Sequence, residues 1–563
     1  MKKRKIVALV LAALIPATML IGCGANNNAK NSEKAATTES GKVKDKIVYA
    51  LTSSPTGVFN PLLSDTSYDK SVIALTYSSL LEFDENLNPE PGLAESYEIS
   101  KDNLSITFKL RDNLKWHDGE AITADDIIFT FTTIANKDYP GSRFGNVEKV
   151  VGAKDYHEGK ADSIEGLEKI DDKTIKVTFE ETYAPALSII GGTGIVPKHI
   201  WEGVPVATWK EKKELLSKPV GSGPYKVVTF NEGQDVQLEG FDEYYGGKPK
   251  TNKFIFKVTN EDTAQIELLN GTVDIVDVSN LKNQDLDEIK AKDKSIISYP
   301  NSMFQYMGFN LREEKFKDKN LRKAFMYAID RKTMVDKLLE GRGTIVNTPM
   351  LTTSWAYPDE KTLNGYDYNV EEAKKLIKEA GYEDKNGNGI VEDKSGKELK
   401  ATLYYPTGNK LREQTAPIIK ESLKKIGVDI ELESMEFQAL MEKVVANHEF
   451  DLYLMANTPG SEPNPMAFWH STSSSDEKGN SAWNISAFKN KEADKLIEDG
   501  LKTFDTEERK KIYGEFAKIM NDELPWVYLY DQDVTKATNS KLKNYKPIAH
   551  GDFIDVENWY IEE

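Results

Sequence analysis

Strand-type and helix-type hydrophobic patterns alternate along most of this chain. In residues 104–110, 175–179 and 428–432, apolar and polar side chains alternate with a period of two, which predicts strands with one buried face. Residues 321–329 and 373–380 place apolar side chains three and four positions apart, the pattern of an amphipathic helix. Because the two patterns interleave, the sequence predicts an α/β fold.

Length and charge narrow the class of protein further. The chain has 563 residues, more than one hydrophobic core usually serves, so we expect more than one domain. Its first 22 residues hold four of the 73 basic side chains and none of the 91 acidic ones, so the remainder carries 69 basic against 91 acidic groups, a net charge of −22. Such an acidic surface disfavours nucleic acid as a partner. We also expect the protein to be a monomer.

The N-terminus resembles that of a secreted bacterial lipoprotein. Residues 2–5 are basic, residues 6–21 are apolar, and Leu20-Ile21-Gly22-Cys23 is similar to a lipobox, in which Cys23 becomes the lipidated first residue. Residues 24–46 contain few large apolar side chains, as in a disordered tether. We therefore predict a signal peptide at 1–22, a tether at 23–46 and a lipid anchor on the extracytoplasmic face of a bacterial membrane. The alternative is an ordinary signal peptide followed by an incidental cysteine.

Polar residues in the segment 108–131 have two interpretations. A strand ends near Leu110, residues 117–119 (HDG) favour a tight turn, and Thr123 is placed to cap a helix whose first turn carries two acidic residues. Read without that context, Trp116, His117 and Asp118 could instead form a catalytic cluster. The turn and the cap account for every polar residue here, so we favour the structural interpretation.

Several segments in this order resemble one known family. They are residues 91–97 (PGLAESY), 197–199 (PKH), 221–225 (GSGPY), 244–249 (YYGGKP), 308–310 (GFN) and 328–330 (AID), together with the segment 108–131. This set is similar to the signature of the family 5 extracellular solute-binding proteins, the peptide, nickel and related receptors of ABC importers. Each segment alone is a weak signal, but the ordered set extends over most of the chain.

The resemblance implies a two-lobed α/β fold of the periplasmic-binding-protein type. The first lobe would comprise residues 47–300 and 526–563, with an extra subdomain at about 83–210, and the second lobe residues 301–525. Two chain crossings would then form a hinge, and closure of such a hinge around a ligand is known for this class of protein.

The resemblance also suggests ligand contacts. Extended backbone at Asp65, Thr66 and Ser67 would add hydrogen bonds to a peptide main chain. Where the family has an Asp-Pro-Asp-Pro-like turn that meets the ammonium group of a peptide, this chain has Glu462-Pro463-Asn464-Pro465, so Glu462 would supply the carboxylate, unless it is a solvated surface residue. Further candidate ligand contacts are Arg143, Phe144, Gln305, Tyr306, Asn464, Trp469, Trp483 and Asn484.

A short acidic segment allows a calcium loop. Asp384, Asn386 and Asn388 match the start of an EF-hand loop, and Ile390 could offer its carbonyl group. The twelfth position is Ser395 where a glutamate is needed, so Glu392 or Asp393 would have to replace it. The alternative is a plain turn between a helix and the strand at 400–405. No other cofactor is expected.

Signals for catalysis are weak. The six histidines are far apart, without HExxH spacing, and neither a GxSxG elbow nor a phosphate loop occurs. We therefore expect no enzyme but a receptor that captures short peptides and delivers them to the permease subunits of an ABC transporter. The alternatives are the same kind of receptor for a nickel or other metal chelate or small solute, a surface peptide hydrolase, and a calcium-bound surface interaction protein.

Overall fold

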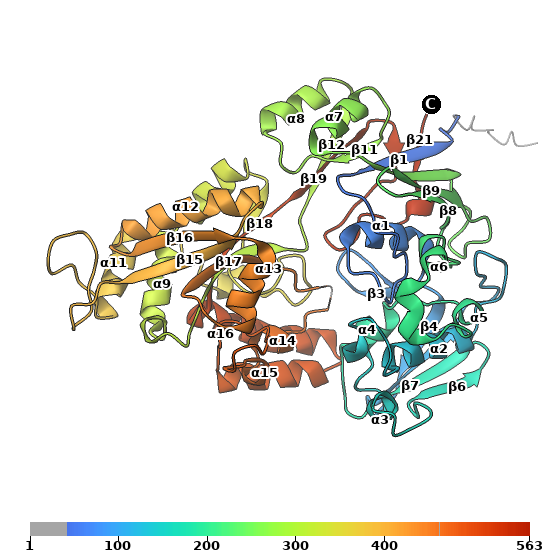
Figure 1. The fold of residues 1–563 in the computed structure, drawn as a ribbon, viewed down its shortest axis with the longest axis horizontal. Helices are drawn as coiled ribbons and strands as arrows, with labels where there is room; N and C mark the ends of the chain where they lie inside the picture. Colours follow the sequence, from blue (N-terminus) through green and yellow to red (C-terminus); the bar gives the residue numbers. More distant parts are fainter. Residues whose placement is uncertain (1–41, 461) are drawn as a thin grey trace, which may run out of the picture. The chain divides into compact units, whose positions relative to one another are not determined.

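A computed structural model describes residues 42–460 and 462–563 of the chain (Figure 1). The predicted signal peptide, Cys23 and most of the predicted tether lie outside the described residues. Within the described ranges, no helix combines the length and the apolar character needed to cross a membrane.

The first lobe is built on a seven-stranded mixed sheet. Alternate residues of its strand β1 (Lys46–Leu51) enter two different cores: Ile47, Tyr49 and Leu51 pack with α1 (Ser67–Thr76), whereas Val48 and Ala50 pack with α7 (Glu261–Leu269) and α8 (Asn283–Lys290). The two faces of the sheet are therefore both covered, as the unbroken apolar run of β1 requires. The strand order is β12 (Lys294–Tyr299), β19 (Val534–Asn539), β11 (Ile275–Asp277), β1, β10 (Lys253–Val258), β9 (Asp235–Gly240) and β8 (Tyr225–Asn231).

A four-stranded antiparallel sheet lies within the predicted extra subdomain. Its order is β4 (Ala94–Ile99), β5 (Ser105–Leu110), β7 (Thr174–Thr178) and β6 (Leu167–Asp171). The helix α2 (Ala124–Ala135) begins with a capping box. The Thr123 side chain accepts a backbone N–H of the first helical turn, and the Asp126 side chain accepts the backbone N–H of Thr123. The predicted cap at Thr123 is thus confirmed. Short helices α3 (Ala153–His157), α4 (Ala186–Gly191), α5 (Lys198–Trp201) and α6 (Lys213–Ser217) and the strand pair β2 (Leu81–Phe83) and β3 (Pro89–Pro91) complete this part of the lobe.

His117 acts as a structural tie in this subdomain. Its Nε2 atom lies 2.9 Å from the carbonyl oxygen of Gly223, and its Nδ1 atom accepts the backbone N–H of Gly221 at 3.2 Å. Burial lowers the pKa of His117 to about 4, so the ring is neutral near pH 7. The ring therefore joins two of the recognised segments, in agreement with the structural interpretation.

The second lobe is built on a six-stranded mixed sheet. Its order is β14 (Gly343–Ile345), β18 (Trp526–Gln532), β13 (Phe304–Phe309), β17 (Leu452–Asn457), β15 (Lys400–Pro406) and β16 (Asp429–Met435). Every residue of β13 is buried, as expected for a strand between covered faces. The helices of this lobe are α9 (Lys319–Ala328), α10 (Arg331–Thr333), α11 (Val370–Glu379), α12 (Lys410–Lys424), α13 (Phe437–Met441), α14 (Met466–Trp469), α15 (Lys491–Lys502) and α16 (Thr506–Glu523).

The chain passes between the two large sheets twice. It leaves the first sheet after β12, enters the second with β13, and returns between β18 and β19, which only Asp533 separates. The predicted return at residue 526 is therefore wrong, because β18 pairs with β13 and β14 in the second lobe. The two-lobed α/β fold itself is confirmed. The short C-terminal strands β20 (Leu542–Lys543) and β21 (Tyr560–Ile561) pair with each other.

Candidate functional site

A cavity of about 1700 Å³ opens in the first lobe. Its wall includes residues at the carboxyl ends of the parallel strands β1 and β11, the place where ligands commonly bind in α/β sheets. Helix α1 turns Ser67, Lys70, Ser71 and Ala74 toward the cavity, at the spacing of one helix face. All lining residues lie outside residues 303–533, so the wall belongs to the first lobe and to the first chain crossing.

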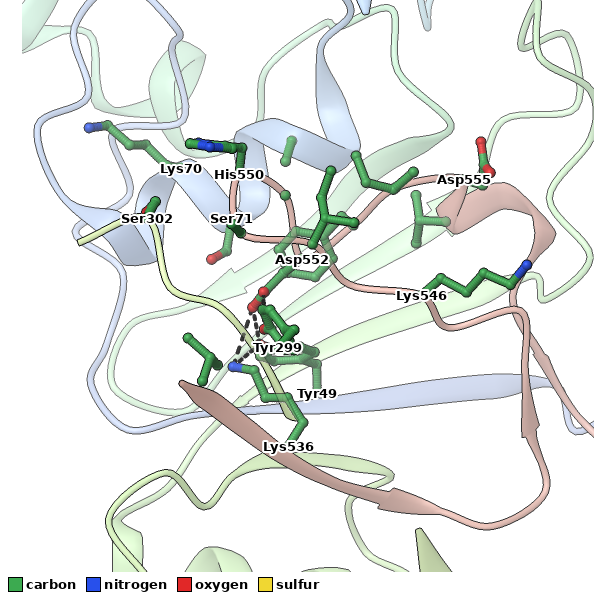
Figure 2. A pocket seen from close by; sticks show the side chains of 18 of the residues that line it. Tyr49, Lys70, Ser71, Tyr299, Ser302, Lys536, Lys546, His550, Asp552 and Asp555 are labelled. Atoms are coloured by element: carbon green, nitrogen blue, oxygen red, sulfur yellow. Dashed lines mark hydrogen bonds and ion pairs between the residues drawn. The ribbon is translucent and has the colours of Figure 1, made fainter. Parts of the chain in front are cut away.

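An ion cluster around the buried Lys536 forms the floor of this cavity (Figure 2). Lys536 of β19 places its Nζ atom 3.1 Å from Oδ2 of Asp277 and 3.3 Å from Oδ2 of Asp552, and it donates a hydrogen bond of 2.9 Å to the hydroxyl of Tyr49. Asp552 in turn accepts hydrogen bonds from Tyr49 at 2.8 Å and from Tyr299 at 2.5 Å. The cluster joins β1, β11, β12 and β19 to the C-terminal segment.

Electrostatics keep this lysine charged. Burial alone lowers the pKa of Lys536, but the carboxylates of Asp277 and Asp552 outweigh burial and raise that pKa well above its usual range. Burial acts to raise the pKa of Asp277, but Lys536 and the hydrogen bonds from Ser279 together lower it. The cluster is therefore a set of paired charges at neutral pH.

The wall as a whole is acidic. It carries nine acidic and four basic side chains, in addition to His550; these are Glu82, Asp84, Glu85, Glu90, Glu261, Asp277, Asp552, Asp555, Glu557, and Lys70, Arg111, Lys536, Lys546. Two of the glutamates have raised pKa values. Burial raises the pKa of Glu82, with a further increase from Asp555, and burial also raises the pKa of Glu557, which has Asp555 and Glu82 nearby. Glu82 is nevertheless open to the cavity, since its side chain remains accessible to solvent.

The predicted contacts at residues 65–67 lie at the start of α1. Ser67 is in the cavity wall, whereas Asp65 and Thr66 are not among the lining residues. Thr66 caps the helix by accepting the backbone N–H of Asp69 at 3.1 Å, and its hydroxyl donates to Oδ2 of Asp69 at 2.6 Å. Asp65 is exposed.

Arg143 and Phe144 lie beside this turn. Arg143 donates from Nη2 to the carbonyl oxygen of Ser64 at 3.1 Å, and Phe144 stacks on the ring of His157 with a centroid separation of 3.9 Å. Neither residue lines the cavity. Arg143 thus ties the subdomain to the segment that precedes α1, and Phe144 packs within the subdomain.

Three of the second-lobe candidates are internal. Tyr306 is 2% exposed and stacks on Trp526 at 3.6 Å in the core, and Gln305 is buried and accepts a hydrogen bond of 2.9 Å from Nε of Arg412. The Asn484 amide is also buried and donates to the backbone carbonyl groups of His470 and Phe488. The three side chains are thus engaged within the second lobe, and their predicted ligand contacts stay predictions.

Glu462 already has a partner. Its carboxylate forms an ion pair with Nη2 of Arg509 on α16, and the two side chains are only 12% and 6% exposed. Arg509 also donates from Nε to the carbonyl oxygen of Gly500 at 2.9 Å. The predicted ammonium anchor is thus neutralised by the protein and lies outside the wall of the large cavity.

Asn464, Trp469 and Trp483 lie near Glu462 in the second lobe. Asn464 and Trp469 line a second cavity, of about 40 Å³, and the Asn464 side chain accepts the backbone N–H of Met466 at 3.0 Å. Trp483 is half exposed and packs on Phe468. The structure therefore brings these residues together in the second lobe. None of them lines the large cavity that includes Ser67.

The proposed calcium loop forms a tight turn. Asp384 accepts the backbone N–H groups of Gly387 at 2.7 Å and Gly389 at 3.0 Å, and Glu392 accepts from the backbone of Lys385 at 3.0 Å. In residues 42–460 and 462–563, no group of three or more His, Cys, Asp or Glu side chains could hold a metal ion. Calcium also binds backbone carbonyl groups and the side-chain oxygens of Asn and Gln, which are not included in such groups. The calcium loop therefore stays a prediction.

Sequence reasoning missed most of the cavity wall. Tyr49, Tyr299, Lys536 and Asp552 come from four segments that are up to about 500 residues apart, and no local motif connects them. One signal was available, because Asp277 directly ends an apolar strand pattern at the carboxyl edge of a sheet.

Comparisons with known proteins agree with this architecture. A profile of the bacterial extracellular solute-binding proteins, family 5 Middle, matches residues 88–480. The oligopeptide-binding protein AppA of Bacillus subtilis (strain 168) is 32% identical over 565 residues, which cover 100% of both chains.

Two solved structures are similar over nearly the whole chain. AppA from Bacillus subtilis in complex with a nonapeptide has a TM-score of 0.73 and 30% identity, covering 93% of this chain and 100% of that one. NikZ from Campylobacter jejuni in complex with Ni(L-His) has a TM-score of 0.74 and 27% identity, covering 92% and 99%. With a fold, a family profile and a full-length relative in agreement, this chain belongs to the bacterial extracellular solute-binding proteins of family 5.

Proposed function

We propose that this protein is a membrane-anchored receptor that captures short peptides in the first-lobe cavity and delivers them to an ABC permease. The observation that carries the proposal is the size and polarity of the cavity. Pockets for drug-sized molecules measure about 300–1,000 Å³, whereas this one measures about 1700 Å³ and has a wall of mixed polar and apolar side chains. A peptide, with its polar main chain and varied side chains, matches such a space. The similarity to AppA, whose solved complex holds a nonapeptide, supports the same ligand class.

The wall also offers a surface for the peptide main chain. Ser67, Lys70 and Ser71 on α1 present polar groups to the cavity, and Ser302 lies on the first chain crossing (Figure 2). Contacts to a main chain hold a peptide without reading its sequence, which suits a receptor that takes varied cargo. The first chain crossing, at residues 300–303, would also form part of the hinge between the lobes. A ligand in the cavity would therefore contact the segment about which the lobes close.

Membrane attachment rests on the lipobox-like segment that ends at Cys23. A diacylglyceryl group on Cys23 would supply the two acyl chains that stable anchoring needs. Replacement of Cys23 by Ala should abolish incorporation of radiolabelled palmitate into the protein. Undiminished labelling in the Cys23→Ala variant would refute the anchor and leave the ligand proposal standing.

Native mass spectrometry with a mixed library of peptides of two to eight residues tests the ligand class. The wild-type protein should retain peptides, and an Ala74→Trp variant should retain far fewer, because Ala74 lines the cavity and an indole there fills part of it. A matched Ala291→Trp variant, changed at an exposed residue outside the wall, should bind as the wild type does. Equal capture by the Ala74→Trp and Ala291→Trp variants would contradict the assignment of the cavity.

A metal chelate is the second candidate ligand. The similarity to NikZ, solved with Ni(L-His), favours it, as does His550 in the cavity wall, whose Nε2 atom has no hydrogen-bond partner among the described residues. The same mass measurement with nickel and L-histidine decides between the two. A chelate retained by the protein in the presence of excess peptide would favour this candidate.

A further inference from the structure

The two lobes contact each other at a place other than the chain crossings. The backbone N–H of Ala184, in the subdomain of the first lobe, donates a hydrogen bond of 2.8 Å to the carbonyl oxygen of Leu501 near the end of α15. Phe504, which follows α15, packs against the hydrophobic core that contains α2 and β5 of the subdomain. We call residues 183–184 and 501–504 together the interlobe contact.

The first lobe completes the C-terminal end of α15. The last four carbonyl groups of a helix have no partner within that helix. The carbonyl oxygen of Gly500 accepts a hydrogen bond of 2.9 Å from Nε of Arg509, which belongs to the same lobe. The next carbonyl group, that of Leu501, has its partner in Ala184 of the other lobe. Separation of the lobes would therefore leave the Leu501 carbonyl group and the Ala184 N–H to water.

A buried ion pair holds this helix end in place. Arg509 of α16, which donates to Gly500, also pairs with the carboxylate of Glu462, and both side chains are nearly inaccessible to solvent. Gly500 itself packs closely on α16, since a Cβ atom added there would lie 2.3 Å from a ring carbon of Tyr513. The segment 501–504 is therefore presented to the first lobe from a fixed support, and the Glu462–Arg509 pair positions that support.

The first-lobe side of the contact is supported as well. Ala184 is 5% exposed, and the carbonyl oxygen of Tyr183 accepts the backbone N–H of Ala186 at 3.0 Å at the start of α4. The Tyr183 ring packs on the same subdomain core as Phe504, and Nζ of Lys149 lies 5.5 Å from the ring centre. Both sides of the interlobe contact are thus ordered parts of their own lobes.

We propose that the interlobe contact is a latch, which holds the lobes closed through protein groups alone and must break whenever the lobes open. A contact that exists only in the closed form shifts the balance between open and closed forms toward the closed one. Burial of the Phe504 ring supplies most of this shift, because the backbone groups of Ala184 and Leu501 can bind water once they separate. The inference does not depend on which ligand the protein takes.

Distances between two spin labels, one in each lobe, test the inference. The labels are carried by the full-length protein with Cys23→Ala, which removes the only natural cysteine, and with Lys160→Cys and Lys332→Cys. Lys160 lies in the first lobe and Lys332 in the second, and both are exposed. Pulsed electron paramagnetic resonance should give one dominant distance in this protein. Adding Phe504→Ala should increase the fraction of longer distances at least threefold.

Two further variants connect the effect to the latch. Phe437→Ala is the matched control, because Phe437 lies on α13 of the same lobe and is 42% exposed, and it should leave the distances unchanged. Phe504→Leu keeps part of the apolar contact and should give an intermediate fraction. Hydrogen exchange of the proteins without labels gives a second measurement, in which the Ala184 amide should exchange at least threefold faster with Phe504→Ala than with Phe437→Ala.

Equal distance distributions in the Phe504→Ala and Phe437→Ala proteins would overturn the latch. Equal exchange rates of the Ala184 amide in these two proteins would overturn it as well, as would exchange in the wild type at the rate of an unstructured peptide. Circular dichroism checks that the variants are folded. If Phe504→Ala is unfolded, the same comparisons between Phe504→Leu and Phe437→Ala decide the question.

Discussion

At the scale of single residues, the cavity floor depends on one buried cation. Replacing Lys536 by Met would leave the carboxylates of Asp277 and Asp552 without their shared partner. Since their side chains are 43% and 27% exposed, we expect a loss of about 2–3 kcal/mol in the free energy of unfolding, below the usual cost of breaking a fully buried pair. Urea denaturation measures it. Lys248→Met, which removes an exposed ion pair, should change stability by no more than about 0.5 kcal/mol.

If Lys536→Met and Lys248→Met had equal effects, the floor would not depend on the buried cation. An unchanged unfolding free energy in both variants would point to the same conclusion. The aromatic partners offer a further check, because Tyr49→Phe removes one donor to Asp552 and keeps the packing of the ring.

Glu462 is a second residue whose role can be separated by mutation. A Glu462→Gln change leaves Arg509 buried without its carboxylate, so we expect a loss of about 3 kcal/mol in unfolding free energy. Peptide affinity should change much less, because Glu462 lies outside the wall of the large cavity. Calorimetry with a free and an acetylated peptide decides the point. A stable Glu462→Gln protein that no longer distinguishes these two peptides would restore Glu462 as the ammonium anchor.

At the scale of elements, the cap of α2 holds the strand-turn-helix segment of the subdomain. Thr123→Ala removes a side-chain acceptor at the helix start and should cost about 1 kcal/mol of unfolding free energy. Thr123→Ser keeps the acceptor and should cost less than half as much. Thermal denaturation compares the two variants. Equal melting temperatures for the Ala and Ser variants would show that the cap contributes nothing.

Hydrophobic periodicity predicted individual elements well. The strand expected at 104–110 is β5 (Ser105–Leu110), and the helix expected at 321–329 is α9 (Lys319–Ala328). The return crossing was placed wrongly for a physical reason. Strands β18 and β19 are separated by Asp533 alone, without a Gly or Pro, so the local pattern does not show that two neighbouring strands join different sheets.

The candidate site was harder to predict than the fold. Of the predicted ligand contacts, Ser67 lies in the cavity wall, while Tyr306 and Asn484 are core or loop-supporting residues. Aromatic residues bury large areas in any core, so their type alone does not separate ligand contacts from packing. The ion cluster around Lys536 joins distant segments, and only the folded chain reveals it.

At the scale of the whole molecule, an unusual carboxyl group lies at the return crossing. Asp531 at the end of β18 is 1% exposed, and its Oδ1 atom has no hydrogen-bond partner among the described residues. Burial, with a smaller contribution from Asp533, raises the pKa of Asp531 to about 8. In the unfolded chain this pKa is about 3.9, so between about pH 4 and pH 8 the folded protein holds a proton that the unfolded chain has lost.

Because of Asp531, the free energy of unfolding should therefore decrease as pH rises from about 4 to about 8. Asp531→Asn mimics the protonated form and should remove that part of the decline. We expect the melting temperature of the variant to exceed that of the wild type by a margin that grows from pH 5 to pH 8. A constant margin across this range would show that Asp531 is ionised in the folded protein.

The central claim is that the first-lobe cavity holds the ligand, and a crystal structure of the protein with a captured peptide tests it most directly. The account predicts peptide density along the cavity wall, in contact with Ser67 and Ser71 of α1 and above the floor formed by Lys536 and Asp552. Peptide density seated elsewhere, for example beside Glu462 and Trp469 in the second lobe with the first-lobe wall untouched, would contradict it.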